Sequence, residues 1–111
     1  MKDWNITKNK QILEEYEKHT IKQLPENILK NGVIKTLMHR TKSKMIYECR
    51  DKKGIIFYEV FINFVVPVPL KFWVISLYDY QEIYPDKQDY GYRAWIFYDK
   101  TEALRMFISM K

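Results

Sequence analysis

Basic side chains are the strongest chemical signal in the sequence, and they gather between residues 35 and 53. This stretch places seven permanent positive charges and one histidine within nineteen residues: Lys35, His39, Arg40, Lys42, Lys44, Arg50, Lys52 and Lys53. Such a cluster attracts phosphate groups regardless of sequence, and exposed Tyr or Phe rings beside it would stack on bases. We therefore expect a nucleic-acid-binding surface formed by Lys42, Lys44, Arg50, Lys52 and Lys53. The alternative is a solvated sheet edge, because lysines at strand edges also discourage aggregation.

A second candidate surface lies between residues 79 and 92, where tyrosines are interspersed with acidic residues. The set comprises Asp79, Tyr80, Glu82, Tyr84, Asp86, Asp89, Tyr90 and Tyr92. Tyrosine offers a large contact area with a polar tip, and it is enriched at protein interfaces. We expect a protein-binding surface formed by Tyr80, Tyr84, Tyr90 and Tyr92. The alternative is that these rings cap one end of a sheet.

The sequence predicts no metal site and no cofactor. The acidic residues of the second surface lack the glycine and the ligand spacing of a calcium loop. His19 and His39 have no Cys, His or carboxylate at the intervals that zinc sites use. Cys49 is expected to lie in the core, where a thiol is usually inert. No nucleophile with its base can be assembled from sequence spacing, so we favour a protein without catalytic activity, although the members of a triad need not be close in sequence.

One stretch resembles part of a known enzyme family. In residues 24–63, Tyr47, Glu48 and Arg50 match a Tyr-Glu-x-Arg run that ends a strand in the ribosome-dependent ribonuclease toxins of the RelE and HigB type. The resemblance implies a helix over residues 26–38, followed by two strands. It also implies a nuclease in which Arg50 contacts the scissile phosphate and Lys42 or Lys44 holds the RNA. Where that family carries basic residues after the next strand, this chain has Gln81 and Glu82.

A β-hairpin is predicted over residues 45–66, and the rest of the chain is expected to pack around it. Two β-forming runs flank Asp51-Lys52-Lys53-Gly54, which has the residues typical of a type I turn closed by a left-handed glycine. With Asp51 opposite Gly54, the predicted cross-strand pairs are Cys49–Ile56, Tyr47–Tyr58 and Met45–Val60. These six residues then share an apolar face with Ile62 and Phe64. The other, mixed face would carry Ile46, Glu48, Arg50, Phe57, Glu59 and Asn63.

The chain before the hairpin is expected to contain one helix or two. Apolar residues at helical spacing over Lys8–Leu24 predict an amphipathic helix that packs one stripe on the sheet. Residues 26–40 fit a second helix, but Asn31-Gly32 is also a good helix end. We favour a short helix at residues 25–31 followed by a strand from Val33 to Thr41.

The chain after the hairpin is expected to form further strands and a closing helix. The two prolines of Pro67-Val68-Pro69 predict a stiff extended link that ends the second hairpin strand. Alternating residues predict a strand over Phe72–Tyr80, followed by a loop over residues 81–90 and a further β-forming run opened by Gly91. Asp99 and Glu102 have the spacing of a helix N-cap and its partner glutamate, which predicts a helix from residue 100 to about 110.

Together these elements predict an α+β fold in a single domain over residues 1–111. The expected architecture is an antiparallel meander of four or five strands, an N-terminal amphipathic helix or helix pair, and a short C-terminal helix. The chain has 111 residues, of which 47% are hydrophobic, and this is enough to bury a core. The net charge is +5, with 13 Lys and Arg against 7 Asp and Glu in residues 1–53, and 6 against 7 in residues 54–111. The excess positive charge therefore belongs to the first half.

The sequence favours a cytoplasmic protein that has no membrane partner. A single cysteine excludes an internal disulfide, and the first ten residues lack the apolar core of a secretory signal. The apolar stretch from residue 55 to 78 contains Glu59, Lys71 and two prolines, which argues against a membrane-spanning helix.

The sequence predicts a small soluble accessory or regulatory protein that acts by binding a macromolecule, either a protein or a nucleoprotein complex. An inhibitor of a host enzyme that acts on nucleic acid, encoded by a phage or a mobile element, is one example of this class. The alternatives are the ribonuclease toxin that the resemblance implies, and a nucleic-acid-binding module that uses the basic hairpin.

Overall fold

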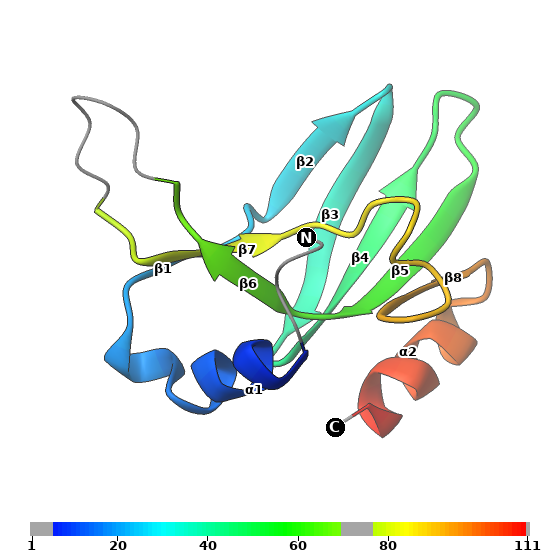
Figure 1. Cartoon of the computed structure of the whole chain (residues 1–111). Helices are drawn as coiled ribbons and strands as arrows, with labels where there is room; N and C mark the ends of the chain where they lie inside the picture. Colours follow the sequence, from blue (N-terminus) through cyan, green and yellow to red (C-terminus); the bar gives the residue numbers. More distant parts are fainter. Residues whose placement is uncertain (1–5, 70–76, 111) are drawn as a thin grey trace. The chain divides into compact units, whose positions relative to one another are not determined.

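The computed structural model describes residues 6–69 and 77–110 (Figure 1). Over these residues the chain is an α+β protein with an N-terminal helix, a five-stranded antiparallel sheet, a small mixed sheet and a C-terminal helix. The predicted fold class is confirmed. The chain forms two compact units, one from the described parts of Met1–Leu24 and Phe64–Tyr84, the other from Pro25–Asn63 and the described part of Pro85–Lys111. The single domain over residues 1–111 stays a prediction.

The first unit combines helix α1 (Ile6–Glu14) and a short 3-10 helix (Tyr16–Lys18) with a three-stranded sheet. The strand order is β1 (Ile21–Lys22), β7 (Tyr80–Ile83) and β6 (Phe64–Pro67), with β1 parallel to β7 and β6 antiparallel to it. The buried carboxylate of Glu82 holds this unit together, because its Oε1 accepts a hydrogen bond from the Leu24 N–H (2.8 Å) and its Oε2 accepts one from the Tyr16 hydroxyl (3.1 Å).

The N-terminal helix is shorter than the predicted helix over Lys8–Leu24. After α1 and the 3-10 turn the backbone becomes extended at His19, and Ile21 and Lys22 join the small sheet. The Asp79 N–H donates hydrogen bonds to both the Thr20 carbonyl (2.8 Å) and the Thr20 hydroxyl (2.9 Å). Tertiary pairing at Thr20 therefore overrides the helical spacing of the apolar residues.

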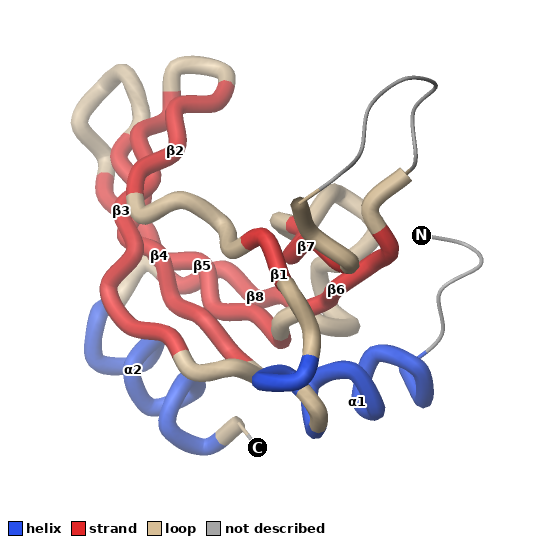
Figure 2. The backbone as a smooth tube through the Cα atoms, turned by 90° about the vertical axis from the view of Figure 1, so that its left-hand side faces the viewer, coloured by secondary structure: helices blue, strands red, loops and turns tan. Residues whose placement is uncertain are grey.

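The second unit is a sheet with the strand order β2 (Asn27–Lys30), β3 (Val33–Arg40), β4 (Lys44–Arg50), β5 (Ile56–Ile62) and β8 (Ala94–Phe97). Helix α2 (Lys100–Ser109) lies along one face of it (Figure 2). A buried cluster joins that face to the helix: Ile46, Tyr58, Val60, Ala103 and Phe107. The predicted C-terminal helix and its cap are confirmed, since the Asp99 carboxylate accepts hydrogen bonds from the N–H groups of Thr101 (2.7 Å) and Glu102 (3.2 Å).

The predicted hairpin forms from β4 and β5, but its register is shifted by one residue. Its second strand ends at Ile62 and not at Val66, since Phe64–Pro67 forms β6 of the small sheet. The Gly54 N–H donates to the Asp51 carbonyl (3.0 Å), the Asp51 N–H donates to the Ile55 carbonyl (3.0 Å), and Gly54 has φ +83°. This is a type I turn followed by a glycine bulge, so Asp51 lies opposite Ile55 and not opposite Gly54. The observed pairs are Cys49–Phe57, Glu48–Tyr58, Tyr47–Glu59, Ile46–Val60 and Met45–Phe61. The predicted pairs Cys49–Ile56, Tyr47–Tyr58 and Met45–Val60 are therefore wrong.

The corrected register also redistributes the faces of the hairpin. Directly paired residues point to the same side of a sheet, so Met45, Tyr47 and Cys49 share a face with Phe57, Glu59 and Phe61. Ile46, Glu48 and Arg50 share the α2 face with Ile56, Tyr58 and Val60. The predicted mixed face therefore does not exist as one surface, and Glu59 lies 3% exposed in the core.

Residues 27–40 form a second hairpin, so the short helix predicted at residues 25–31 is wrong. Asn31 and Gly32 have φ values of +54° and +77°, the geometry of a two-residue type I′ turn, for which Asn-Gly is the preferred sequence. The strand predicted from Val33 to Thr41 is confirmed as β3. The helix over residues 26–38 that the toxin resemblance implies is replaced by β2 and most of β3.

Most of the strand predicted over Phe72–Tyr80 lies outside the described residues. Strand β7 begins at Tyr80 and continues to Ile83, inside the segment that was expected to be a loop. Glu82 in this strand is buried as a hydrogen-bond acceptor, which explains why an acidic residue occurs there. Strand β8 lies within the run opened by Gly91.

Candidate protein-binding surface

Strand β4 separates the five basic residues of the predicted nucleic-acid-binding surface into two groups. Lys42 and Lys44 lie at its start, whereas Arg50 ends it and Lys52 and Lys53 occupy the following turn. The seven residues of the strand span roughly 20 Å. The structure therefore brings Arg50, Lys52 and Lys53 together and leaves Lys42 and Lys44 at the opposite end.

Lys44 caps the C-terminus of helix α2. Its Nζ donates hydrogen bonds to the carbonyls of Phe107 (2.6 Å) and Met110 (2.8 Å) and lies 4.8 Å from the centroid of the Phe107 ring. Helix C-termini leave carbonyls without intrahelical partners and carry a partial negative charge, so an ammonium group stabilises them. The Lys44 ammonium is thus engaged within the chain.

The β2–β3 and β4–β5 turns lie at the same end of the sheet, called here the turn end (Figure 1). The Lys52 side chain passes over Gly32, because a Cβ atom placed on Gly32 would lie 2.0 Å from Lys52 Cε. The Asp51 carboxylate is held inside its own turn, where it accepts hydrogen bonds from the N–H groups of Lys53 (2.9 Å) and Ile55 (3.0 Å).

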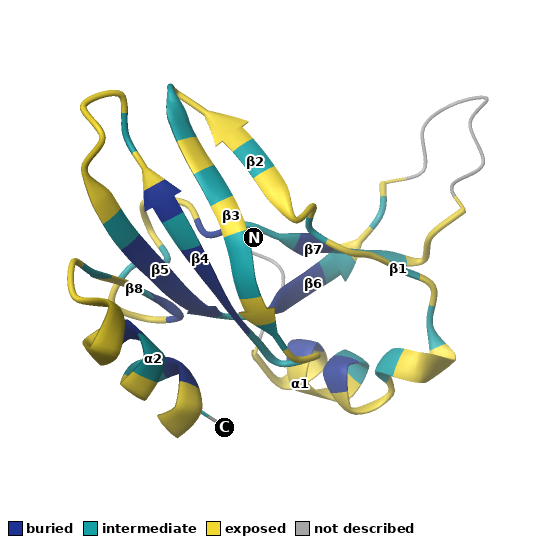
Figure 3. Ribbon diagram, turned by 180° about the vertical axis from the view of Figure 1, so that it is seen from behind, coloured by how far each residue is buried: buried dark blue, intermediate teal, exposed yellow. Residues whose placement is uncertain are grey.

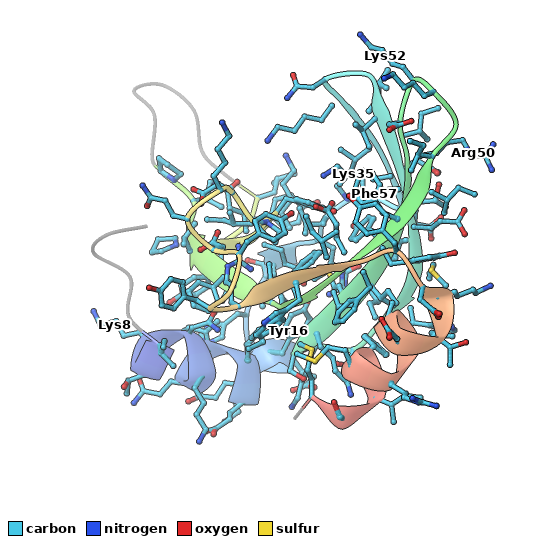
Figure 4. The ribbon with its side chains drawn as sticks, turned by 90° about the vertical axis from the view of Figure 1, so that its right-hand side faces the viewer. Lys8, Tyr16, Lys35, Arg50, Lys52 and Phe57 are labelled. Carbon is cyan, nitrogen blue, oxygen red and sulfur yellow. The ribbon has the colours of Figure 1, made fainter. Side chains whose placement is uncertain are left out.

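A continuous row of exposed side chains crosses four strands at the turn end. In the observed register Leu29 pairs with Ile34, Ile34 with Arg50, and Arg50 with Ile56. These four residues, called here the exposed row, point to the α2 face of the sheet and span roughly 14 Å across the strands. The exposed fraction is 75% for Leu29, 54% for Ile34 and 37% for Ile56. In Figure 4 Arg50 points away from the sheet on the side opposite to Lys35 and Phe57.

The exposed row differs from the row of residues beside it on the same face. That neighbouring row starts with Asn27, Thr36 and Glu48, which are the polar residues expected where an antiparallel sheet faces water. Helix α2 covers the part of the face around Tyr58. Towards the turn end, exposed residues alternate with intermediate ones along β2, β3 and β5, and β4 is buried just before its exposed end (Figure 3). Single exposed apolar residues are common on proteins, but a contiguous set points to a binding surface.

Positive charge gathers at the turn end, beyond the exposed row, whereas Glu48 lies in the neighbouring row on the other side of it. Besides Arg50 within the row, the turn end carries three exposed lysines, called here the lysine rim: Lys30, Lys52 and Lys53. The acidic residue among them, Asp51, is the one held in its turn by backbone hydrogen bonds. Lys30 follows Leu29 in β2 and therefore points to the opposite face of the sheet. The turn end thus combines an apolar row with exposed basic side chains.

The four tyrosines of the second predicted surface lie in different environments. Tyr80 and Tyr84 belong to the first unit, where Tyr80 meets the His19 ring edge-on at 5.1 Å between centroids. Tyr90 and Tyr92 belong to the second unit, where Tyr92 is 83% exposed and the Tyr90 hydroxyl donates to Glu59. Tyr80 and Tyr90 thus make contacts within their own units.

A buried polar cluster lies on the sheet face opposite to α2. The Glu59 Oε1 atom accepts hydrogen bonds from Lys35 Nζ (2.7 Å) and from Cys49 Sγ (3.3 Å), and Oε2 accepts one from the Tyr90 hydroxyl. Burial, followed by the hydrogen bond to Glu59, raises the pKa of the Tyr90 phenol far above its usual range. Cys49 is fully buried as predicted, and the arrangement is that of a structural cluster whose members satisfy one another.

The segment that carries Tyr90 is fixed to the same sheet by Arg93. Its guanidinium donates a hydrogen bond to the Ile62 carbonyl (2.7 Å), pairs with Asp89 at 3.4 Å and lies over the Phe61 ring. Burial lowers the pKa of Arg93, and the neighbouring Asp89 carboxylate opposes that shift. Arg93 is thus engaged with the body of the protein.

Within residues 6–69 and 77–110, His, Cys, Asp and Glu side chains form no group of three or more with the geometry of a metal site. In the same part of the chain, no helix has the length and apolar character needed to cross a membrane. Comparisons of the chain with protein-family models, with curated proteins and with solved structures find no match.

Sequence reasoning missed the exposed row, because Leu29, Ile34 and Ile56 have the residue types of a core. Only the register across four strands shows that they share one uncovered surface. Two local signals bear on that register: Asn31-Gly32 as a hairpin turn, and Gly54 as a bulge position.

Proposed function

We propose that this chain is a small accessory or regulatory protein that acts by binding another protein through the turn end of its five-stranded sheet. The observation that carries the proposal is the exposed row, in which Leu29, Ile34 and Ile56 remain uncovered beside Arg50. Burying such apolar side chains in a complex is favourable, since each buried methylene contributes about 0.8 kcal/mol.

The chemistry of the surface favours a protein over a nucleic acid as the partner. Nucleic-acid binding without sequence preference uses a basic groove together with aromatic rings on which bases stack. The exposed row is aliphatic, and Lys42 and Lys44 lie at the far end of β4. An aliphatic patch with one arginine and a lysine rim is suited instead to an apolar and acidic protein surface.

Site-specific photo-crosslinking in cells that naturally produce the chain tests this proposal. A photoreactive phenylalanine at position 34 reports on the exposed row, and the same residue at position 105, on the exposed side of α2, serves as the control. We expect position 34 to give a nuclease-resistant protein adduct that position 105 does not give. Arg50→Glu, which reverses the charge within the row, should abolish that adduct.

Three outcomes would overturn the proposal. The first is an adduct that disappears after nuclease treatment, because it would assign the surface to nucleic acid. The second is equal labelling from positions 34 and 105, because it would mean contact without a specific surface. The third is a position-34 adduct that forms at full yield in Arg50→Glu, because it would show that the charge of Arg50 does not contribute to binding.

A further inference from the structure

Strand β2 ends the five-stranded sheet on one side, so its outer backbone edge bears on how a partner binds. Within the part of the chain that the structure describes, β2 pairs with β3 and with no other strand. The Leu37 N–H donates to the Glu26 carbonyl (2.7 Å), and Lys30 pairs with Val33 across the Asn31-Gly32 turn.

The alternation of an antiparallel ladder then fixes which backbone groups face outwards. Residues 26, 28 and 30 direct their N–H and C=O groups towards β3, so Asn27 and Leu29 direct theirs away from it. Both residues are exposed. The outer edge of β2 therefore presents the donors and acceptors of two residues in the spacing that an added strand requires.

Natural proteins usually protect such edges, and β2 carries little of that protection. Its pairing with β3 is regular, since the one register shift in this part of the sheet lies between β3 and β4, at Leu37 and His39. Strand β2 has no proline, and Leu29 in its middle is 75% exposed. Its short length and the lysine at its end, Lys30, are the protective features that remain.

We infer that a strand of the partner protein adds to the outer edge of β2 and thereby extends the exposed row; this inference rests on the proposed function. A strand beside β2 places one of its side chains next to Leu29, so that position is apolar. The lysine rim, of which Lys30 lies at the end of β2, favours acidic residues at alternate positions of the partner strand. The occupant is therefore an extended segment in which acidic and apolar residues alternate.

Fluorescence anisotropy with a labelled octapeptide of alternating glutamate and valine tests this mode of binding on the full chain. We expect the corresponding lysine and valine peptide to bind at least about tenfold more weakly. Leu29→Pro removes the outward N–H group and keeps the ladder to β3, since proline is tolerated at edge positions of this kind. It should weaken binding of the acidic peptide by about tenfold, roughly the effect of one lost hydrogen bond, and more than Leu29→Ala does.

Amide hydrogen exchange of the unmodified chain provides a readout that does not depend on the folding of a variant. The amides of Asn27 and Leu29 should exchange rapidly in the free chain and become protected when the peptide binds. Absence of peptide binding, or binding without protection of these two amides, would overturn strand addition.

The same measurements separate this inference from the proposed function. If the position-34 crosslink depends on Arg50 but survives Leu29→Pro, the protein-binding surface stands and strand addition is wrong. Protection of both amides in the free chain that increases with its concentration would mean that a second copy occupies the edge, and would also overturn the inference.

Discussion

Lys35 and Glu59 form an ion pair across the middle of the sheet, with 2.7 Å between Lys35 Nζ and Glu59 Oε1. They lie on β3 and β5, and Cys49 of the intervening strand β4 donates to the same carboxylate oxygen. The two side chains are 12% and 5% exposed, so both charges have lost most of their water. The pair and the Cys49 hydrogen bond therefore tie three strands together, and removal of either charged partner leaves the other charge buried without its counter-charge.

Glu59→Gln should lower the free energy of unfolding by roughly 3 kcal/mol, and Lys35→Met by a similar amount, because each variant leaves one buried charge behind. The double variant should be more stable than the sum of the two losses predicts, with a coupling of at least about 1 kcal/mol. Urea unfolding followed by circular dichroism measures all four proteins. Lys30→Met, at an exposed position, is the control and should change stability by less than about 0.5 kcal/mol. Additive losses would mean that the pair contributes nothing as a unit.

Tyr90 should make the protein less stable at alkaline pH. Burial and the hydrogen bond to Glu59 raise the pKa of its phenol above the ordinary value of 10.0. The unfolded chain therefore loses this proton at a lower pH than the folded chain does, so the stability that Tyr90 contributes is complete below pH 10.0 and declines as pH rises above it. Above that pH, the free energy of unfolding should fall more steeply for the wild type than for Tyr90→Phe, by up to about 1.4 kcal/mol per pH unit.

Urea unfolding at several pH values between 8 and 10.5 measures these slopes. Tyr92→Phe removes an exposed hydroxyl in the same segment and controls for the loss of a tyrosine. Equal slopes for the wild type and Tyr90→Phe would show that the Glu59 contact does not hold the phenol in its protonated form.

Elements determined by local chemistry were predictable from the sequence. The Asp99 cap acts on amides two and three residues away, so helix α2 could be located from neighbouring residues alone. The β4–β5 turn was also identified from its own four residues. Its register was not, because the glycine bulge at Gly54 adds one residue to the loop and moves every pair along β4 and β5.

Features that depend on distant pairing were not predictable. Asn31-Gly32 fits both a helix end and a type I′ turn, and the pairing of Val33–Arg40 with β4 decides for the turn. The exposed row requires three successive registers to be known before Leu29 and Ile56 can be placed on one surface. The hydrogen bond between Tyr90 and Glu59 joins residues that are 31 positions apart, and no local pattern indicates it.

Lys44 and Lys42 should respond differently to substitution, although both were assigned to one basic surface. Lys44→Met removes three hydrogen bonds to the end of α2, to the carbonyls of Phe107, Ile108 and Met110, and the contact with the Phe107 ring. It should therefore cost about 1–2 kcal/mol of stability. Lys42→Met should cost less than about 0.5 kcal/mol, because Lys42 contacts Asn63 through its backbone carbonyl, which the substitution retains. Thermal unfolding of both variants measures the difference. Equal losses would contradict the role of Lys44 as the cap of α2.

Gly32→Ala and Gly54→Ala provide a matched test of the turn end. Both glycines have positive φ, +77° and +83°, so an alanine at either position pays about 1–2 kcal/mol for the left-handed conformation. The new Cβ at position 54 meets no atom within 4 Å, whereas the Cβ at position 32 meets the Lys52 side chain at 2.0 Å. The outer part of a lysine is flexible, so we expect it to move aside and the two variants to differ by less than about 0.5 kcal/mol in urea unfolding.

The stability of a double variant shows whether the Lys52 side chain clashes with the new Cβ atom of Gly32→Ala. Any excess loss of stability of Gly32→Ala over Gly54→Ala should disappear when Lys52→Ala is added. The side chain of alanine at position 52 is too short to reach the new Cβ atom at position 32. An excess that persists without the lysine would mean that the strain lies in the backbone of the β2–β3 turn.

Gly32→Ala should also weaken the position-34 crosslink more than Gly54→Ala does, since it displaces one charge of the lysine rim beside the exposed row. Equal crosslinking yields from the two variants would show that Lys52 does not belong to the binding surface.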